Sequence, residues 1–488
     1  MNKIQLFAGL FITSSLQLHA QDKPVTLQVD WSTVTSVSKT TPTLQLVENP
    51  MVRPSSPIHK ATFEALKNLG ADYVRYVPWF PYPKMAVAEL KAPTKEKTSW
   101  DFTYADSTME ALMNATAGHS VVINFSTTPA WIWENNTEVK YPDDPYQVFW
   151  DYNPGTRLRD TTMKELAQYF ARLVSWYTKG GFTDELGVQH KSNHFYKIPY
   201  WEVLNEPDLE HDISPQQYTK MYDAIVTEIK KVSPSTKFIG ISVAFNGNPE
   251  WFEYFLNPKN HLPNIPLDGI SYHFYATPSF DHQKIEDYQY TFFEKANAFL
   301  EKVRYIENIR KRLSPHTITT INEIGSIIGY MDGKGIPDTY WNLSGATYAY
   351  LFIELTKLGI DVAGESQLVG YPTQFPDVSM MNWTNGKPNA RYWILKLIKE
   401  NFGPGDKLVA TSISGSDLIC QAFNTAKGKK ILVINPRNKE VLVTIPSAAT
   451  ISKTSVDVGT ADNPPGMMSL NGNLVKISPY EVAVITIN

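Results

Sequence analysis

Cysteine is almost absent from this chain of 488 residues, in which Cys420 stands alone. One cysteine can form no disulfide within the chain and supplies no cysteine-based metal site, so we interpret Cys420, in an apolar strand-like run, as a buried small hydrophobe. Neither sign of charge strongly predominates, because the formal net charge is −4 and no basic block stands out. We therefore expect no nucleic-acid partner.

Long apolar runs are missing as well, except at the N-terminus. Lys3 precedes apolar residues 6–16, and the stretch ends at Ala20, a pattern typical of a signal peptide over residues 1–20. We expect cleavage near Ala20, an exported protein that is periplasmic or secreted, and no membrane span. The chain also lacks a Gly-x-Gly-x-x-Gly loop and a His-Glu-x-x-His motif, and we expect neither a cofactor nor a metal.

What the chain does contain is an alternation of strand-like and helix-like segments from about residue 25 to residue 400. The expected strands are residues 25–29, 72–78, 120–125, 200–204, 237–243, 267–275, 317–321 and 361–368. About eight such units predict a (β/α)₈ TIM barrel within residues 21–403. An open doubly wound sheet is the alternative, and the absence of a glycine-rich phosphate loop disfavours it.

The composition changes after Gly403-Pro404-Gly405. Short β-rich runs follow as far as residue 487, separated by turn residues such as those at positions 463–466. This pattern predicts an antiparallel β-sandwich domain over residues 404–488, with room for completion by N-terminal residues.

The most informative motif ends the expected fourth strand. The run 200–204 is typical of a buried strand, and it stops at Asn205-Glu206-Pro207 because proline cannot continue a ladder of hydrogen bonds. Active sites of (β/α)₈ barrels lie where the strands end. A turn or a helix cap is the plainer interpretation, since asparagine and proline are ordinary turn residues.

A second glutamate closes the expected seventh strand. Glu323 follows the β-branched run 317–321, and in an eight-stranded barrel it faces Glu206 across the mouth. Two such carboxyl groups are the equipment for glycoside hydrolysis, in which one donates a proton to the leaving oxygen and the other attacks the anomeric carbon. Asn205 is placed to hydrogen-bond the 2-hydroxyl of the sugar.

These motifs resemble clan A of the glycoside hydrolases. The Pro-Ala-Trp at residues 129–131 and the His-x-Tyr within residues 271–275 resemble that clan's third- and sixth-strand motifs, and residues 201–208 are especially similar to glycoside hydrolase family 39. That family contains β-xylosidases and α-L-iduronidases with a β-sandwich beside the barrel. The resemblance covers most of the chain and implies that Glu206 is the general acid/base and Glu323 the nucleophile of a retaining mechanism.

Three further residues are candidates for the barrel mouth. Arg75 is a charge within a strand pattern, where it would keep Glu323 ionised or simply sit exposed at a strand end. His273 and Tyr275 alternate on one strand face, so both can point inward. We expect His273 to bind a sugar hydroxyl, unless it is a satisfied core histidine, and Tyr275 to orient Glu323.

The remaining candidates follow other strands. Trp131 is a stacking platform for a sugar ring or part of the core, and Trp383 is expected to wall the pocket of the cleaved sugar. Glu365, at the end of the eighth strand, would bind substrate hydroxyls or pair with a neighbouring arginine. Residues 210–212, Glu-His-Asp, have no second histidine cluster, so we interpret them as the start of the helix at Pro215 rather than a metal site.

The leading hypothesis is a retaining exo-glycosidase that releases a terminal sugar, xylose first, from oligosaccharides derived from plant or algal polysaccharides. Alternatives with the same chemistry are an α-L-arabinofuranosidase, a uronidase or an endo-glycanase. An alternative of another class is a carbohydrate-binding protein without turnover, since barrels host many functions. The expected partner is an oligosaccharide, and the sequence carries no signal of oligomeric state.

Overall fold

The computed structural model describes residues 24–135, 138–277, 285–328, 335–370, 375–415, 418–446 and 450–487. The predicted signal peptide lies outside these residues.

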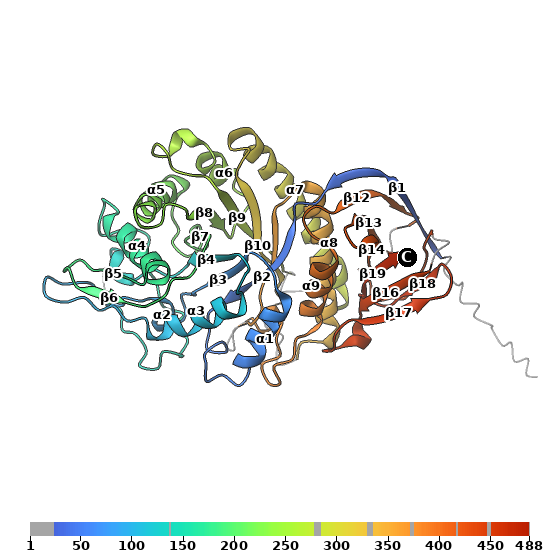
Figure 1. Cartoon of the computed structure of the whole chain (residues 1–488), viewed down its shortest axis with the longest axis horizontal. Coiled ribbons are helices and arrows are strands. Elements are labelled where there is room, and N and C mark those ends of the chain that lie inside the picture. Colours follow the sequence, from blue (N-terminus) through green and yellow to red (C-terminus); the bar gives the residue numbers. More distant parts are fainter. Residues whose placement is uncertain are drawn as a thin grey trace, which may run out of the picture.

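Eight parallel strands close into a barrel, which confirms the predicted fold (Figure 1). In chain order they are β2 (Thr41–Val47), β3 (Val74–Val77), β4 (Val121–Phe125), β7 (Tyr200–Val203), β8 (Lys237–Val243), β9 (Gly269–Ala276), β10 (Ile318–Ser326) and β11 (Val362–Glu365). Residues of β3 and β4 are buried without alternation, as expected for parallel strands that are covered on both faces.

Helices surround the barrel and connect its strands. They are α1 (His59–Leu69), α2 (Pro83–Ala86), α3 (Thr103–Ala115), α4 (Lys164–Lys179), α5 (Pro215–Val232), α6 (Pro249–Phe255), α7 (Tyr288–Leu313), α8 (Asp338–Leu358) and α9 (Ala390–Asn401). Their ends follow local chemistry. Ser214 caps α5 by accepting from the backbone of Gln217, and Gly70 ends α1 in the left-handed conformation at φ 57°.

Short elements complete the connections. A hairpin of β5 (Gly181–Thr183) and β6 (Gln189–Lys191) follows α4, and the 3₁₀ turns are η1 (Ala130–Ile132), η2 (Pro258–Asn260), η3 (Ile285–Asp287), η4 (Pro376–Val378) and η5 (Val458–Thr460). Among the residues that the structure describes, we find no helix whose length and apolar character would let it cross a lipid bilayer.

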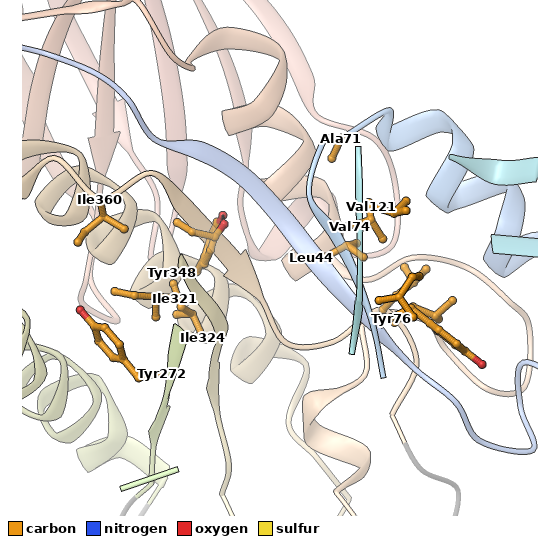
Figure 2. Packing of buried hydrophobic residues seen from close by; sticks show 14 of the residues in the cluster. Leu44, Ala71, Val74, Tyr76, Val121, Tyr272, Ile321, Ile324, Tyr348 and Ile360 are labelled. Atoms are coloured by element: carbon orange, nitrogen blue, oxygen red, sulfur yellow. Dashed lines mark hydrogen bonds between the residues drawn. The ribbon is translucent and has the colours of Figure 1, made fainter. Parts of the chain in front are cut away.

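The main core lies between the strands and their helices. Figure 2 shows Tyr272 of β9 and Ile321 and Ile324 of β10 close to Tyr348 of α8, and all four side chains are at most 2% exposed. Tyr348 also satisfies its hydroxyl by donating to the backbone oxygen of Ala363, at 2.9 Å. These strand side chains therefore pack against the helix that covers them.

The second domain is a nine-stranded, mostly antiparallel sheet that folds into a sandwich. Its strands are β1 (Val25–Val37), β12 (Lys407–Ile413), β13 (Ile419–Thr425), β14 (Gly428–Ile434), β15 (Val441–Thr444), β16 (Ile451–Val456), β17 (Gly466–Leu470), β18 (Leu474–Ile477) and β19 (Val482–Ile487). A separate apolar cluster, which includes Leu27, Ile431, Val443 and Ile485, fills it.

The prediction that residues 25–29 form the first barrel strand is wrong. They belong to β1, which pairs with β12 and β15 of the sandwich. The physical reason is visible in the burial. The start of β1 alternates between buried and exposed residues, which suits a half-exposed sheet, whereas β2 is buried almost throughout. Pro42, near the start of β2, is atypical of a central strand, so the sequence pattern did not indicate β2 as the first barrel strand.

Helices α8 and α9 lie between the barrel and the sandwich (Figure 1). Phe402, just after α9, packs on Phe423 of β13 with ring centroids 4.5 Å apart. Leu408, Leu432 and Val484 of the sandwich belong to the same apolar cluster as the barrel core. The two domains therefore share a continuous hydrophobic interface.

Candidate active site

Glu323 lies at an irregularity in β10. The register with β9 shifts between Thr320 and Glu323, and the register with β11 shifts between Ile321 and Ile324. An extra residue at a bulge re-aims the side chains that follow it. Glu323 is thereby directed into the barrel mouth, where 9% of its side chain is exposed.

Glu206 follows β7 in a tightly held turn. Leu204 and Glu206 both have positive φ angles, 61° and 41°, which residues other than glycine adopt at an energetic cost. Hydrogen bonds hold the turn against the end of β8, because the backbone N–H of Glu206 donates to the carbonyl oxygen of Ser242 at 2.9 Å. Nearby, the carboxylate of Asp208 accepts from the backbone N–H groups of Ala244 and Phe245.

Arg75 of β3 is fully buried beneath these two glutamates. Its Nη1 donates to Glu323 Oε1 at 2.5 Å and to Gln45 Oε1 at 2.8 Å. Its Nη2 donates to Asn205 Oδ1 at 2.7 Å, and also to Ser242. The structure thus places Arg75 against Glu323, and every nitrogen of the guanidinium is engaged by the protein once Glu202 is included.

Glu202 was not among the residues predicted for the site. It lies on β7, four residues before Glu206, and its carboxylate accepts from Arg75 Nε at 2.5 Å. It also accepts from Asn124, Ser271 and Asn322, which come from three other barrel strands. A charged residue within a fully buried strand run was the signal that pointed to it. Glu202 acts as the structural counter-charge of Arg75.

His273 of β9 contacts Glu206. Its Nδ1 lies 2.8 Å from Glu206 Oε1 and 3.6 Å from Glu323 Oε1. Its Nε2 lies 3.3 Å from the Ser242 hydroxyl. Because both ring nitrogens are engaged by the protein, this geometry does not present His273 to a sugar hydroxyl as predicted, and it positions Glu206 instead.

Tyr275, two residues further along β9, contacts Glu323. Its hydroxyl donates to Glu323 Oε2 at 2.7 Å and lies 2.6 Å from the hydroxyl of Ser366. Gly325 makes this approach possible, since a Cβ there would lie only 2.9 Å from the Tyr275 ring. The structure therefore brings Tyr275 into the orienting position that the sequence predicts for it.

The surroundings shift the pKa values of Glu206 and Glu323 in opposite directions. Burial raises the pKa of Glu206, and the facing charge of Glu323 adds to this effect against the opposing hydrogen bond from His273. Burial also acts on Glu323, but His273, Arg75 and the Tyr275 hydroxyl outweigh it and lower the pKa of Glu323. Burial likewise opposes the charged form of His273, and the carboxylates of Glu323 and Glu206 outweigh it and raise its pKa.

A cavity of about 1010 Å³ opens over these residues. Asn205, Glu206, His273, Tyr275 and Glu323 line its floor. Its walls are aromatic: the lining includes Trp79, Phe80, Trp150, Tyr152, Phe245 and Phe375. A pocket with an apolar wall and a polar floor is suited to a ring that carries hydroxyl groups.

The aromatic wall was also missed from the sequence. Trp79 and Trp150 meet edge to face with centroids 5.1 Å apart, although they come from loops after different strands. Trp150 remains 38% exposed, and Phe245 on the loop after β8 is 60% exposed. Nothing local in the sequence distinguishes these rings from core aromatics. Only the folded loops bring them together.

Three predicted substrate contacts lie away from this cavity. The indole N–H of Trp131 donates to the backbone oxygen of Glu89 at 2.7 Å, and Arg159 covers its ring. Trp383 lines a different cavity of about 480 Å³, near Val458 of the sandwich. The placement of these two tryptophans contradicts their predicted contacts with the cleaved sugar.

Glu365 is the third predicted contact that does not reach the cavity. Its side chain is completely buried and accepts from Arg391 Nε at 2.9 Å. This is the alternative arrangement that the sequence analysis proposed, namely pairing with a neighbouring arginine. A substrate-binding role for Glu365 is contradicted by its burial.

Three residues of this site, Glu206, His273 and Glu323, are of types that can bind a metal ion. One ligand atom each from Glu206, His273 and Glu323 lies within 4.8 Å of the other two. Arg75 already donates to the Glu323 oxygen that also faces His273, so a positive charge occupies the position where a cation would be needed. Hydrogen bonds therefore account for this cluster.

No protein-family model matches the chain. A β-xylosidase from Geobacillus stearothermophilus is 30% identical to it over 148 residues, which make up 29% of this chain and 28% of that protein. The match thus spans little more than a quarter of the curated relative.

Solved structures match over nearly the whole length. The GH51 arabinofuranosidase from Xanthomonas axonopodis pv. citri has a TM-score of 0.66 at 12% identity, with 95% of this chain and 100% of that chain covered. The α-L-arabinofuranosidase from Thermotoga maritima has a TM-score of 0.60 at 15% identity, with 94% and 99% covered. The catalytic domain of GH30 xylanase C from Talaromyces cellulolyticus has a TM-score of 0.56 at 13% identity, with 95% and 100% covered.

These comparisons confirm the predicted architecture, a (β/α)₈ barrel with a C-terminal β domain. Identities this low establish the fold alone. Together with the local match to the β-xylosidase, they support the resemblance to clan A glycoside hydrolases.

Proposed function

We propose that this protein is a retaining glycoside hydrolase in which Glu206 is the general acid/base and Glu323 the nucleophile. The observation that carries the proposal is the pair of carboxyl groups in the cavity, whose oxygens approach within 4.8 Å and whose pKa values are shifted in opposite directions. Carboxyl groups about 5–5.5 Å apart are typical of retaining enzymes, whereas inverting enzymes need about 6.5–9.5 Å to admit a water molecule.

In the first step, a Glu323 oxygen attacks the anomeric carbon while the bond from that carbon to the leaving oxygen breaks. Glu206 transfers its proton to the leaving oxygen and becomes a carboxylate. In the second step, Glu206 takes a proton from water, whose oxygen bonds to the anomeric carbon as the ester to Glu323 breaks. Both glutamates then return to their starting states.

The neighbouring residues prepare each glutamate for its role. Arg75 and Tyr275 each donate to one oxygen of Glu323, which fixes the carboxylate and favours its charged form. His273 holds Glu206 at 2.8 Å. After its proton has left, Glu206 carries a negative charge that the same histidine is placed to stabilise, so His273 serves both steps.

We propose a terminal β-xyloside, in oligosaccharides from plant or algal polysaccharides, as the leading substrate. The local identity to a β-xylosidase supports this choice, and the aromatic walls suit a pyranose with few substituents. An α-L-arabinofuranoside is the second candidate, because two of the solved structures with the same fold are named arabinofuranosidases. The N-terminal signal pattern further leads us to propose that the protein is exported.

A panel of 4-nitrophenyl glycosides tests the proposal. We expect turnover of the β-D-xyloside, and proton NMR of the first product is expected to show the anomeric configuration of the substrate. An inverted first product contradicts retention. Binding of sugars without turnover of any glycoside would instead support a carbohydrate-binding protein.

A second experiment separates the roles of the two glutamates. With an activated aryl glycoside and added azide, Glu206→Ala is expected to yield a glycosyl azide of retained configuration, because the glycosyl-enzyme still forms on Glu323. Glu323→Ala lacks the nucleophile, so azide attacks the substrate directly and gives the inverted azide. The reverse pattern of products would exchange the two assignments.

A further inference from the structure

A third carboxyl group, Glu210, lines the same cavity and has no part in the proposed chemistry. It follows Glu206 by one turn, because its backbone N–H donates to the Glu206 carbonyl oxygen at 2.7 Å. Its neighbour His211 turns away, stacks on Trp133 and contacts the backbone oxygen of Gly155. The two residues are therefore separated in space, and Glu210 alone faces the pocket.

Glu210 is held on one side only. Its Oε1 accepts from Asn205 Nδ2 at 2.9 Å, and Asn205 is in turn fixed by Arg75. Within the described part of the chain, Oε2 has no hydrogen-bond partner, and it is not among the buried polar atoms that lack one. This oxygen therefore faces the cavity, where a bound molecule can reach it.

The electrostatic setting of Glu210 favours its neutral form. Burial raises its pKa well above the usual range, and the charges of Glu206 and Glu323 add to the effect. A neutral carboxyl group offers one O–H donor and one acceptor, which is the same pair of functions that a sugar hydroxyl offers in return. Asn205 keeps the group in one orientation.

Cations that could receive an anionic sugar are lacking in the described lining of the cavity, which contains neither lysine nor arginine. The buried Arg75 is saturated by protein acceptors. Both nitrogens of His273 are engaged as well. A carboxylate or sulfate on the sugar would thus meet the ionised Glu323 without a lysine or arginine in this described lining, which opposes its binding.

We infer that Glu210 is a specificity-determining residue that binds a hydroxyl of a neutral sugar, in a pocket where the ionised Glu323 opposes sugars that carry a carboxylate or a sulfate. The inference rests on the proposed glycosidase function and narrows its substrate class. It favours the xyloside and arabinofuranoside over a uronide. It also gives Asn205 a positioning duty, since the amide that was predicted to meet the sugar holds Glu210 as well.

A cycle of protein and substrate changes tests the hydrogen bond. The wild type and Glu210→Ala are compared on the aryl glycoside that the panel identifies and on its monodeoxy analogues. We expect Glu210→Ala to lower kcat/KM about tenfold to a hundredfold on the parent sugar, with most of the change in KM. One deoxy analogue is expected to lose a similar factor in the wild type and nothing further in the variant.

Two controls separate binding from folding and from positioning. Glu210→Gln keeps an acceptor for Asn205 and a donor for the sugar, so it is expected to stay within about fivefold of the wild type. Glu64→Ala, at an exposed position on α1, is expected to change nothing. For each monodeoxy analogue, the loss of kcat/KM relative to the parent sugar is compared in the wild type and in Glu210→Ala. If this loss is the same in both proteins for every analogue, Glu210 does not touch the sugar and the inference is wrong.

The charge selection is tested with the matched aryl uronide. We expect the wild type to cleave it at least about a hundredfold more slowly than the neutral glycoside, and Glu210→Gln, which replaces one neutral group with another, to leave that ratio unchanged. Equal cleavage of the two glycosides by the wild type overturns the exclusion of anionic sugars. If the wild type cleaves no glycoside at all, the proposed function fails and this inference fails with it, whereas an active enzyme with uncoupled penalties refutes only the role of Glu210.

Discussion

Two glutamate–arginine pairs lie at the ends of neighbouring barrel strands and differ in almost every other respect. Glu323 on β10 pairs with Arg75 under the open cavity, and Glu365 on β11 pairs with Arg391 out of contact with solvent. The pKa of Glu323 is lowered although burial opposes it, whereas burial raises the pKa of Glu365 to about 7 despite Arg391.

The difference lies in the number of donors rather than in the presence of an arginine. Glu323 has Arg75, Tyr275 and a nearby His273 around its two oxygens. Only Oε1 of Glu365 is hydrogen-bonded, and Oε2 is buried without a partner. Donors on both oxygens thus favour the charged form of Glu323, whereas one half-satisfied carboxyl group beside an arginine does not stay ionised as easily.

The largest expected effect comes from removing the charge of the reactive pair. Glu323→Gln keeps an acceptor for Arg75 but no longer has a carboxylate to attack the anomeric carbon, so kcat is expected to fall on the order of 10⁴-fold. Steady-state kinetics on the aryl glycoside measure this loss. Circular dichroism is expected to show an unchanged fold, and full activity in this variant would remove Glu323 from the mechanism.

The same substitution in the buried Glu365–Arg391 pair, Glu365→Gln, is expected to leave kcat/KM within about threefold of the wild type. Its effect appears in stability. Because the pKa of Glu365 in the folded state, about 7, is raised above the value near 4.5, the folded protein holds this proton more tightly. That contribution to stability is complete below about pH 4.5 and is lost as the pH rises through about 7.

Denaturant titrations at several pH values measure this linkage. The free energy of unfolding of Glu365→Gln, relative to the wild type, is expected to rise by about 3 kcal/mol between pH 4.5 and pH 8, because glutamine does not titrate. Glu323→Gln is not expected to show this rise, because the pKa of Glu323 in the wild type is lowered rather than raised. A flat difference for Glu365→Gln would mean that its carboxyl group stays charged in the fold.

A smaller effect is expected in the pH dependence of kcat/KM. Activity needs Glu206 protonated and Glu323 ionised, so it falls about tenfold per pH unit above the raised pKa of Glu206 and again below the lowered pKa of Glu323. With an activated leaving group, Glu206→Ala is expected to lose the high-pH limb and to keep the low-pH limb. Persistence of both limbs in the variant would assign the acid to another group.

The smallest effect is expected outside both pairs. Trp131→Phe and Trp383→Phe change rings that do not line the cavity, so kcat/KM is expected to stay within about threefold of the wild type. Trp150→Ala is the matched comparison, because that ring lines the cavity wall, and its KM is expected to rise by about fivefold or more. Equal effects at all three tryptophans would mean that the substrate extends beyond the cavity.

The sequence predicts the barrel and the position of both glutamates at its mouth, because the evidence is local. Strand runs that end in Asn205-Glu206-Pro207 and in Glu323 put each carboxyl group at a strand end. In a barrel these strand ends lie around the same mouth, so the two carboxyl groups are brought together. Tyr275 follows by the alternation of side chains along a strand. Such features depend on periods of two residues or on a single breaker residue.

What the sequence does not reveal depends on loops and on partners far along the chain. Trp131 and Glu365 had suitable types and places, yet Glu89 and Arg391 satisfy them elsewhere. The sequence predicts Glu210 at the start of the helix at Pro215, whereas the structure places it against Asn205, after a turn in which Glu206 has a positive φ. The packing of segments that are distant along the chain, or the path of a turn, sets these outcomes, and periodicity carries no information about either.

The position of β1 has a consequence for how the molecule is made. This strand pairs Leu27 with Ile413 and Val25 with Val443, so its partners are synthesised only after all the strands of the barrel. Until they emerge, β1 has an unsatisfied edge while the barrel between them can already close. The sandwich is therefore completed after the barrel, by contacts between the segments that precede and follow it. Contacts between such distant residues form slowly, which makes this sheet the expected late step of folding.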